Sequence, residues 1–475
     1  MKKEKVVIIG AGSAMFTRGL VRDFIDEKWQ LDLGLVDTDP DALAVAEKLS
    51  HKMIDGCDAP ITLSASTDRR DVLPDATAII CTIGVGGRRA WEQDVFIPRK
   101  YGIFQPVGDT VAPGGTSRAL RMIPAMVAIA QDVLDVCPDA LFFNYANPMA
   151  VICRAVRKAT GANIIGLCHG VHHTGHYLAA QLGCKSHDIS YTAAGINHLT
   201  WFTELRIGPN DMMPALREAA ARKLPVSVGA GQAIPWIARA CPGRATCDRS
   251  GRRPPPTYEQ FINDNPFSWQ LFDLFDAFPA VLDRHVTEFF PQFFARGCYY
   301  GKTLGIDAYS FEDCIAYGDE LYEQMRQDAL SPEPLGREYF DRIGGEQEQV
   351  VEILQSIRGN AERVYSVNLP NHGQVPNLPA DSVVESPGIT ATAGSPPTGF
   401  RPLMLPPLPA GIAGTLATRF MWVETTVEAA LEGSRKKFIQ ALVLDGAVDS
   451  VETATKLADD LLAAQARYLP QFSDK

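Results

Sequence analysis

The chain begins its regular structure with Val6-Val7-Ile8-Ile9-Gly10-Ala11-Gly12-Ser13, four apolar residues followed by a turn that carries two glycines. The apolar run predicts a short buried strand, and the residues after the turn, Ala14 to Glu27, predict a helix. A second strand is expected over Leu31 to Val36, ending at Asp37. A glycine turn between a strand and a helix lets backbone amides and the helix N-terminus approach a pyrophosphate.

This arrangement indicates a dinucleotide site formed by Gly10, Gly12, Ser13 and Asp37. A carboxylate at the end of the second strand accepts hydrogen bonds from an adenosine ribose and disfavours a 2′-phosphate, so Asp37 favours NAD over NADP. The third glycine of the usual fingerprint is absent, because Met15 occupies its position. On the two glycines alone, FAD or another nucleotide stays open as a competitor.

Apolar strands continue to alternate with helices up to about residue 190, and the pattern is mixed beyond it. The strands are expected over Ala78–Ile83, Ala140–Asn144 and Ile164–Leu167, and the helices over Thr116–Leu134 and Met149–Lys158. Such alternation predicts a parallel sheet covered on both faces. We therefore predict an α/β fold, with a Rossmann-like doubly wound parallel sheet over 1–190. A mixed α+β catalytic domain over 191–475 is expected to provide substrate, metal and subunit contacts.

The composition is that of an ordinary soluble protein. The chain has 475 residues, of which 46% are hydrophobic and 21% charged, with a net charge of -11. An acidic balance argues against nucleic acid or an anionic membrane as partner. Neither a secretion signal nor an apolar run of membrane-spanning length is seen, and the ten cysteines lie scattered. We therefore expect a cytoplasmic protein that acts on a small molecule.

Two stretches interrupt the regular pattern. Residues 224–256 are rich in Gly, Pro and Arg and are expected to form a long loop or insertion. Cys241 and Cys247 lie within it, but with no second cysteine pair they are read as loop residues rather than as a metal site. Residues 387–409 carry many prolines and are expected to form an extended connection.

Two polar segments follow predicted strands at the edge of the sheet where ligands bind. Gly84-Val85-Gly86-Gly87-Arg88-Arg89 is either a ligand-binding turn or a glycine turn with two solvated arginines. Asn147, in Asn144-Tyr145-Ala146-Asn147-Pro148, is placed to hydrogen-bond a substrate hydroxyl or the nicotinamide ribose. A helix-capping role before Pro148 is compatible with that binding role.

The segment Cys168-His169-Gly170-Val171, followed by Ala194-Gly195-Ile196-Asn197-His198, contains the most informative chemistry. Cys168 and His198 offer a thiolate and an imidazole to a divalent cation, and His169 offers a proton carrier at the same place. Together with the dinucleotide turn, they suggest an enzyme that uses a metal and NAD at one sugar.

In these motifs the chain resembles glycoside hydrolase family 4, the NAD- and metal-dependent glycosidases, almost from end to end. The matching segments are Ile8-Ile9-Gly10-Ala11-Gly12-Ser13, Thr67-Asp68-Arg69-Arg70, Gly108-Asp109-Thr110, Pro113-Gly114-Gly115 with Arg118-Ala119-Leu120-Arg121, Asn144-Tyr145-Ala146-Asn147-Pro148, Cys168-His169, Gly195-Ile196-Asn197-His198, Asp283-Arg284-His285 and Asn371-His372-Gly373-Gln374-Val375-Pro376-Asn377-Leu378-Pro379.

The resemblance implies a redox route to hydrolysis, which is an exception to the two-carboxylate scheme of other glycosidases. NAD⁺ takes hydride from C3 of the sugar, and the ketone acidifies the proton on C2. A base removes that proton while a divalent metal, for which we expect Mn²⁺, stabilises the enediolate. The C1 group leaves, water adds, and the hydride returns, so the net redox change is zero. The family also suggests a homodimer or homotetramer.

The same resemblance assigns roles to residues. It implies that Cys168 and His198 bind the metal and that His169 is the acid that protonates the leaving oxygen. Asn147 and Asp109 correspond to substrate-binding positions. Family members use Tyr or Asp as the base in the region of residues 279–285; this segment has no Tyr, so Asp283 is the candidate base. The alternative for Asp283 is an ordinary surface carboxylate that forms an ion pair with Arg284.

Substrate choice rests on the residues after Cys168. In the family, Asn in that place accompanies 6-phosphoglycosidases and His accompanies enzymes of unphosphorylated sugars, so His169 argues against a sugar phosphate. Gly170 with Val171 resembles the α-galacturonidases, and the missing side chain at Gly170 is expected to leave room beside the sugar. Arg284 or His285 would then pair with a C6 carboxylate.

Other activities stay open at this point. Within the family they are α-galactosidase, α-glucosidase and α-glucuronidase. Outside it they are an NAD-dependent 2-hydroxy acid dehydrogenase, which has no need of Cys168 with His198, and a catalytically silent NAD-binding regulator.

Overall fold

A computed structural model describes residues 4–223, 265–294, 297–299, 302–304, 308, 310–343, 349–391 and 398–472. The expected insertion at 224–256, with Cys241 and Cys247, lies outside the described residues.

The first half of the chain forms six parallel strands in the order β3-β2-β1-β4-β5-β6. They are β1 (Glu4–Ile9), β2 (Leu31–Val36), β3 (Ile61–Ser66), β4 (Ala78–Cys81), β5 (Leu141–Asn144) and β6 (Ile164–Gly166). This is the strand order of a Rossmann fold, and the prediction of a Rossmann-like parallel sheet is confirmed. The edge strand β3 was not expected, because its apolar residues alternate with Thr and Ser in a short run.

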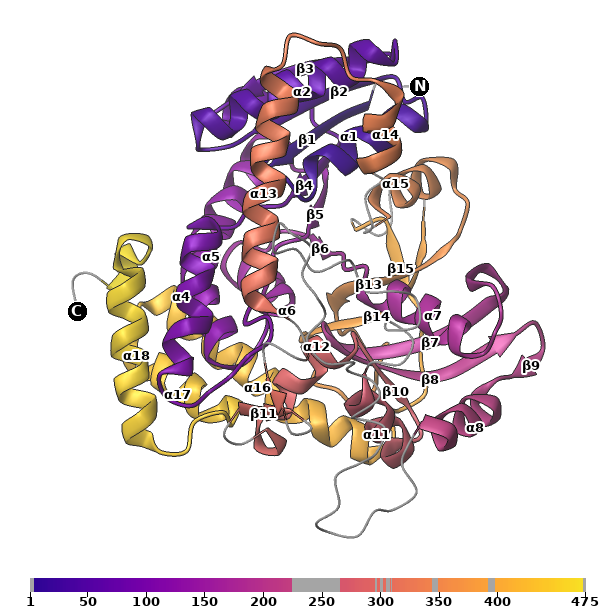
Figure 1. The fold of residues 1–475 in the computed structure, drawn as a ribbon, viewed down its shortest axis with the longest axis vertical. Coiled ribbons are helices and arrows are strands. Elements are labelled where there is room, and N and C mark those ends of the chain that lie inside the picture. Colours follow the sequence, from indigo (N-terminus) through magenta and orange to yellow (C-terminus); the bar gives the residue numbers. More distant parts are fainter. Residues whose placement is uncertain are drawn as a thin grey trace, which may run out of the picture.

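Helices cover both faces of these strands (Figure 1). They are α1 (Thr17–Asp26), α2 (Pro40–Gly56), α3 (Arg69–Val72), α5 (Ala112–Val136) and α6 (Met149–Thr160). Helix α4 (Gly87–Arg99) packs on α5, and α7 (Gly170–Gln181) packs against strands of the second half of the chain. Successive residues of a strand point to opposite faces. Accordingly Val6 and Ile8 pack in the core that holds α1 and α2, whereas Val7 and Ile9 pack in the core that holds α5 and α6.

The second half of the chain continues the same sheet with antiparallel strands, in the order β6-β13-β14-β7-β8-β10. The strands are β7 (Ile189–Ile196), β8 (Leu199–Ile207), β9 (Asn210–Asp211), β10 (Phe278–Ala280), β13 (Val364–Pro370), β14 (Val383–Thr390) and β15 (Phe400–Pro402), with β11 (Cys298–Tyr299) and β12 (Lys302–Thr303) as a separate pair. The extended connection expected at 387–409 is only partly correct, because its described residues include the end of β14 and all of β15.

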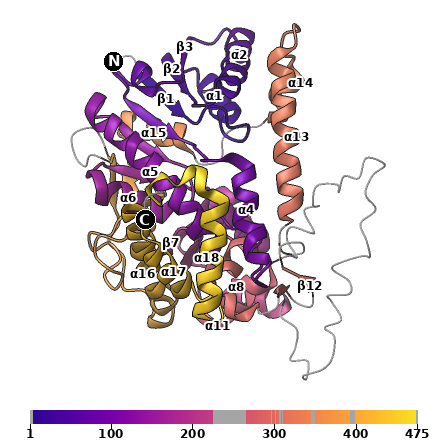
Figure 2. The ribbon, with the colours of Figure 1, turned by 90° about the vertical axis from the view of Figure 1, so that its left-hand side faces the viewer.

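The helices of the second half pack around this sheet and against the helices of the first half. They are α8 (Met213–Lys223), α11 (Pro266–Phe275), α12 (Asp283–Val286), α13 (Phe311–Leu330), α14 (Arg337–Ile343), α15 (Val350–Gly359), α16 (Ala410–Glu432), α17 (Arg435–Asp445) and α18 (Val451–Gln465). The long helix α13 lies against α2, where Lys52 Nζ donates to the carbonyl oxygen of Asp328 at 2.8 Å. Figure 2 shows α16, α17 and α18 beside the helices of the first half. No helix in the described part of the chain is long and apolar enough to cross a membrane.

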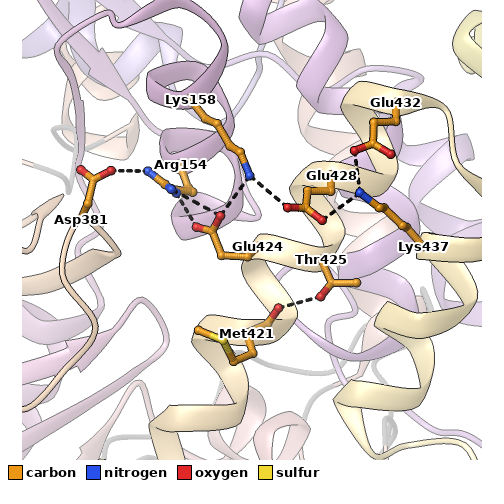
Figure 3. Close-up of polar contacts among 9 residues, drawn as sticks. All are labelled: Arg154, Lys158, Asp381, Met421, Glu424, Thr425, Glu428, Glu432 and Lys437. Atoms are coloured by element: carbon orange, nitrogen blue, oxygen red, sulfur yellow. Dashed lines mark hydrogen bonds and ion pairs between the residues drawn. The ribbon is translucent and has the colours of Figure 1, made fainter.

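A ladder of ion pairs joins α6 to α16 and α17 (Figure 3). Arg154 pairs with Glu424, and Lys158 reaches both Glu424 and Glu428. Lys437 continues the ladder from α17 to Glu428 at 3.0 Å. Exposed pairs such as those of Lys158 contribute roughly 0–1 kcal/mol each, so these ion pairs add modestly to the packing of α6 on α16. This matters for the site because α6 begins two residues after Asn147.

Candidate active site

The sheet order brings the sequence motifs to one edge. Gly10, Ile83, Asn147 and Cys168 follow β1, β4, β5 and β6, which are successive neighbours in the sheet and run in parallel. Their carboxyl ends therefore lie along a single edge, where parallel α/β sheets bind ligands. The glycine turn at Gly10 and the motif at Cys168 thus lie in loops at the same edge of the sheet.

At one end of this edge, the glycine turn is closed by Asp37. The backbone N–H of Gly12 donates to Asp37 Oδ2 at 2.8 Å, and Asp39 N–H donates to Asp37 Oδ1 at 3.0 Å. Gly10 has φ of +97°, and a Cβ there would lie 2.8 Å from the backbone nitrogen of Ile83. Only glycine satisfies both conditions, because it tolerates positive φ and has no Cβ.

The helix after this turn begins at Thr17 rather than at Ala14 as predicted. Ser13 N–H donates to the Gly10 carbonyl at 3.1 Å, and Phe16 N–H donates to Ser13 Oγ at 3.3 Å. The Ser13 side chain therefore stabilises a non-helical turn directly before α1.

The arginines of the second glycine turn are both used in ion pairs. Arg88 contacts Asp319 at 2.6 Å, while Arg89 contacts Glu92 at 2.7 Å and Asp319 at 2.5 Å. These contacts favour the interpretation of this segment as a turn with paired surface arginines.

At the other end of the edge, the structure brings Cys168 and His198 together. Cys168 Sγ lies 3.4 Å from His198 Nε2. With zinc-like bond lengths of about 2.3 Å to sulfur and about 2.1 Å to nitrogen, two ligands of one ion would be about 3.1 Å apart at a right angle and about 3.6 Å apart at the tetrahedral angle. The observed separation therefore suits a shared cation.

His198 is held in an unusual backbone conformation. It lies with Asn197 in the two-residue turn between β7 and β8 and has φ of +67°. Below it, Glu385 accepts hydrogen bonds from Thr200 Oγ1 at 2.8 Å and from Asn197 Nδ2 at 3.4 Å. A left-handed conformation of this kind costs a non-glycine residue on the order of 1–3 kcal/mol, and such strain clusters at functional sites.

Asp109 and Thr110 connect the candidate metal ligand His198 with Asn147. Thr110 Oγ1 lies 2.7 Å from His198 Nδ1 and donates to Asp109 Oδ1 at 2.6 Å. Asn147 Nδ2 donates to Asp109 Oδ2 at 3.0 Å, and Asn147 Oδ1 is buried without a hydrogen-bond partner among the described residues. An unpaired buried acceptor suits a ligand hydroxyl.

His285 was expected to bind substrate, and the structure places it against His198. The two ring centroids are 3.9 Å apart, and His285 is 6% exposed. One ligand atom each from Asp109, His198 and His285 lie within 4.8 Å of one another in the described part of the chain. The structure therefore offers His285 and Asp109 as additional metal donors, a role that the motifs did not indicate.

Burial keeps these imidazoles neutral. It lowers the pKa of His198 to about 4, which the nearby Asp109 carboxylate only partly offsets. Burial, with His198 and the Arg284 cation beside it, also holds the pKa of His285 well below its usual range. Neutral imidazole is the form that binds metals.

The proposed acid, His169, lies directly before α7, at the position preceding the first helical residue Gly170. It is half-buried and close enough to His198 and His285 to affect their protonation. The structure thus brings His169 to the metal-binding group, and its role as an acid stays a prediction.

Asp283, the expected base, is 2% exposed and fully engaged in hydrogen bonds. Its carboxylate accepts from Phe267 N at 2.9 Å, from Ser268 N at 2.7 Å, from Ser268 Oγ at 2.6 Å and from the Tyr299 hydroxyl. A carboxylate has about four lone-pair positions. The alternative of a surface ion pair does not describe this side chain, and capping of α11 is the structural role that competes with catalysis.

The space beside Gly170 is not open. A Cβ at this position would lie 2.4 Å from Val281 Cγ2 and 3.3 Å from Cys168 Sγ. The expectation that the missing side chain leaves room beside a sugar is therefore wrong; Gly170 lets α7 pack closely on the segment that follows β10. The motif could not show this, because Val281 is distant in sequence.

Two cations lie near the metal-binding group. Arg284 is half-buried and close enough to His198, His285 and His173 to lower their pKa values. Arg118, which lies in one of the quoted motifs but was not singled out, donates from Nε to the Asn147 carbonyl at 3.0 Å. Among the described residues it has no ion pair, and burial together with Arg121 lowers its pKa.

Glu288 is a further buried group that the motifs did not reveal. Its Oε1 accepts from Val107 N and Gly108 N, each at 2.8 Å, and so holds the loop that carries Asp109. Burial, with the Asp109 charge nearby, raises the pKa of Glu288 to about 8.

Comparison with known proteins places this site in a family. Residues 5–184 match the model of the family 4 glycosyl hydrolases, and residues 193–448 match the model of the family 4 glycosyl hydrolase C-terminal domain. The chain is 30% identical to an α-glucosidase of Erwinia rhapontici, covering 98% of each protein. It is 29% identical to an α-galacturonidase of Bacillus subtilis, covering 96% of each.

A solved structure has the same fold. The 6-phospho-α-glucosidase from gut microorganisms in complex with NAD and Mn²⁺ superposes with a TM-score of 0.79, covering 99% of each chain, at 19% identity.

Proposed function

The chain belongs to the family 4 glycosyl hydrolases, and we propose that it cleaves α-glycosides with NAD and a divalent metal, Mn²⁺ in particular, its substrate being an α-galacturonide. The observation that carries the chemical part is the 3.4 Å approach of Cys168 Sγ to His198 Nε2 at the same sheet edge as the Gly10 turn. A thiolate and a neutral imidazole are a metal-binding pair, and the glycine turn suits a dinucleotide pyrophosphate.

The residues present fit both groups. A Cβ at Gly12 would lie 2.7 Å from Ala42 Cβ and 2.8 Å from Asp37 Oδ2, so glycine is what allows this turn to pack closely on Asp37 and the start of α2. Gly10, Gly12 and Ser13 would hold the dinucleotide phosphates, and Asp37 the adenosine ribose. Cys168 and His198 would hold the metal, with His285 as an additional donor and Asp109 beside the group.

When bound, NAD⁺ would supply the acceptor for a hydride from C3 of the sugar, and the metal would supply a Lewis acid for the sugar oxygens. The chain's own residues then position the sugar and move protons. Asn147 Oδ1 accepts a hydrogen bond from a sugar hydroxyl, which satisfies its unpaired buried oxygen. His169 protonates the leaving oxygen on C1.

Asp283 is proposed as the base that removes the C2 proton. Burial raises the pKa of its carboxyl, which suits a base, although four hydrogen bonds lower it in part. Those hydrogen bonds make a structural role the competing explanation, and an asparagine at this position separates the two roles.

The C6 carboxylate of a uronide is proposed to pair with Arg284. The subgroup resemblance of Gly170 with Val171 supports this substrate, although Gly170 acts by packing and not by leaving space. Arg118 is a second cation near Asn147 without an ion pair among the described residues. Whole-chain identity does not decide the sugar, since the α-glucosidase and the α-galacturonidase match about equally. The α-galactosidase, α-glucosidase and α-glucuronidase activities remain the alternatives.

We also propose that residues 1–190 bind the nucleotide and that residues 191–475 provide most of the substrate pocket and the contacts of a cytoplasmic homodimer or homotetramer. The metal ligands cross this boundary, because Cys168 precedes it and His198 follows it.

The test compares p-nitrophenyl α-D-galacturonide, α-D-galactoside, α-D-glucoside and α-D-glucuronide with NAD⁺, Mn²⁺ and a thiol present. We expect kcat/KM on the galacturonide to exceed that on the galactoside by orders of magnitude, because the galacturonide offers a C6 carboxylate to the Arg284 cation whereas the galactoside offers only a neutral hydroxyl. Equal values on these two substrates would contradict the uronide assignment and leave the family mechanism intact.

The redox route has its own measurement. NADH should not accumulate in proportion to product, and a substrate deuterated at C2 should release its label to water. Production of one NADH per substrate consumed would instead indicate a dehydrogenase.

A further inference from the structure

We propose that Thr110 and Asp109 select the nitrogen of His198 that binds the metal, so that Thr110 is a positioning residue for the metal centre. The proposal deepens the metal assignment made above and rests on it. It concerns a hydrogen-bond relay, Asp109–Thr110–His198, that lies on the side of the imidazole away from Cys168.

The direction of the relay follows from counting hydrogen atoms. A threonine hydroxyl has one hydrogen, and an ionised carboxylate can only accept. At 2.6 Å from Asp109 Oδ1, Thr110 Oγ1 therefore donates to that carboxylate. The same oxygen lies 2.7 Å from His198 Nδ1, and since its hydrogen is already used it must accept there. His198 consequently carries its proton on Nδ1.

With the proton on Nδ1, the lone pair of the neutral imidazole lies on Nε2. This is the nitrogen that lies 3.4 Å from Cys168 Sγ. Metal-bound histidines commonly donate their other N–H to an oxygen acceptor, which fixes the ring orientation and increases ligand basicity. Thr110 provides that acceptor, and Asp109 orients the Thr110 hydroxyl.

The hydrogen bonds of the relay also bear on which side chains bind the metal beside His198, for which there are two possible arrangements. In the first, the metal lies between Nε2 and Cys168, and Asp109 acts through Thr110. In the second, Asp109 is itself a ligand, as its place in the group with His198 and His285 would allow. The hydrogen bonds from Thr110 to Oδ1 and from Asn147 Nδ2 to Oδ2 engage both Asp109 oxygens and favour the first arrangement.

The experiment measures Mn²⁺ binding to the metal-depleted full chain, without substrate or NAD, by the EPR signal of free Mn²⁺. The variants are Thr110→Val, which keeps the shape but removes the hydroxyl, Thr110→Ser, which keeps the hydroxyl, and Asp109→Asn, which keeps an acceptor for it. Thr17→Val is the matched control, because Thr17 is also buried and its hydroxyl donates to a carbonyl, that of Ala11 at 2.7 Å.

We expect Thr110→Val to weaken Mn²⁺ binding about 10–100-fold, the usual effect of removing a partner of a metal-bound histidine. Thr110→Ser and Thr17→Val should bind like the unmodified protein, and Asp109→Asn should lose less affinity than Thr110→Val. Unchanged affinity in Thr110→Val would overturn the proposal. Loss of binding in Asp109→Asn with little effect of Thr110→Val would also overturn it and make Asp109 a direct ligand.

A second measurement needs no metal and no variant of Thr110. In the metal-free protein labelled with ¹⁵N-histidine, long-range ¹H–¹⁵N correlation should show His198 protonated on Nδ1, with the signal assigned by its disappearance in His198→Asn. Protonation on Nε2 would overturn the relay. If the unmodified protein bound no Mn²⁺, or if Cys168→Ser bound it normally, the metal assignment of the proposed function would fail, and this spectrum would still decide the relay.

Discussion

Replacing Asp283 by asparagine separates a catalytic role of this side chain from a structural one. The carboxylate is buried below α11 and receives four hydrogen bonds, two from backbone N–H groups at the start of that helix and two from the hydroxyls of Ser268 and Tyr299. Asparagine has nearly the same shape but offers one oxygen acceptor and one amide donor.

The cost of Asp283→Asn follows from these contacts. If the new oxygen takes the place of Oδ1, it still accepts from Ser268, whereas the amide faces Phe267 N–H, which then has no acceptor. Hydrogen bonds to charged groups contribute about 1.5–3 kcal/mol, and a buried unsatisfied donor costs about 1–3 kcal/mol. The Tyr299 hydroxyl can turn to accept from the amide, so we expect a net loss of about 3–4 kcal/mol, a large part of the stability of a typical domain.

The assay is urea unfolding at pH 7, followed by tryptophan fluorescence and circular dichroism, with kcat measured at a temperature where the variant is folded. Tyr299→Phe is the control, because it removes one of the four hydrogen bonds and should cost about 1–2 kcal/mol. A purely structural Asp283 predicts a lower unfolding midpoint with turnover retained in the folded variant, whereas the proposed base predicts that turnover is lost in the folded variant while Mn²⁺ binding is retained. An unchanged midpoint would refute the hydrogen-bond reasoning.

Three further predictions follow from the site. Cys168→Ser should abolish turnover and Mn²⁺ binding while NAD⁺ binding persists, and chelation of wild type should do the same; activity that survives a chelator would contradict the metal assignment. Glu288→Gln should flatten the pH dependence of the free energy of unfolding, because burial raises the pKa of Glu288 from 4.5 to about 8. The stability contributed by the protonated Glu288 is full below about pH 4.5 and is lost as the pH rises to about 8. Urea midpoints of both proteins between pH 6.5 and 8.5 check this, and an equal change of midpoint with pH in the two proteins would count against it. Gly170→Ala should destabilise the protein by about 1–3 kcal/mol, since its Cβ would overlap Val281; a midpoint within error of wild type would show that the segment yields without cost.

Much of the first half of the fold could be predicted from local patterns. The buried strands read as apolar runs, and the limits of β2 at Leu31 and Val36 were predicted to the residue. The second half was less predictable, because its strands pair with partners far along the chain. Val364–Pro370, for example, joins β6 to β14 and makes one continuous sheet of both halves.

The sequence alone determined the family, through motifs that the family models match, and it predicted the chemistry of the site: a glycine turn with Asp37 for a dinucleotide, and Cys168, His169 and His198 for a metal and an acid. These features are local, since each depends on residue type and on neighbours within a few positions. Only the tertiary structure showed that the Thr110 hydroxyl contacts His198, that the His285 ring lies against the His198 ring, that four donors surround Asp283 and that Val281 fills the space at Gly170. Each of these contacts joins segments distant in sequence, and hydrogen bonds and close packing depend on distances that residue order does not specify.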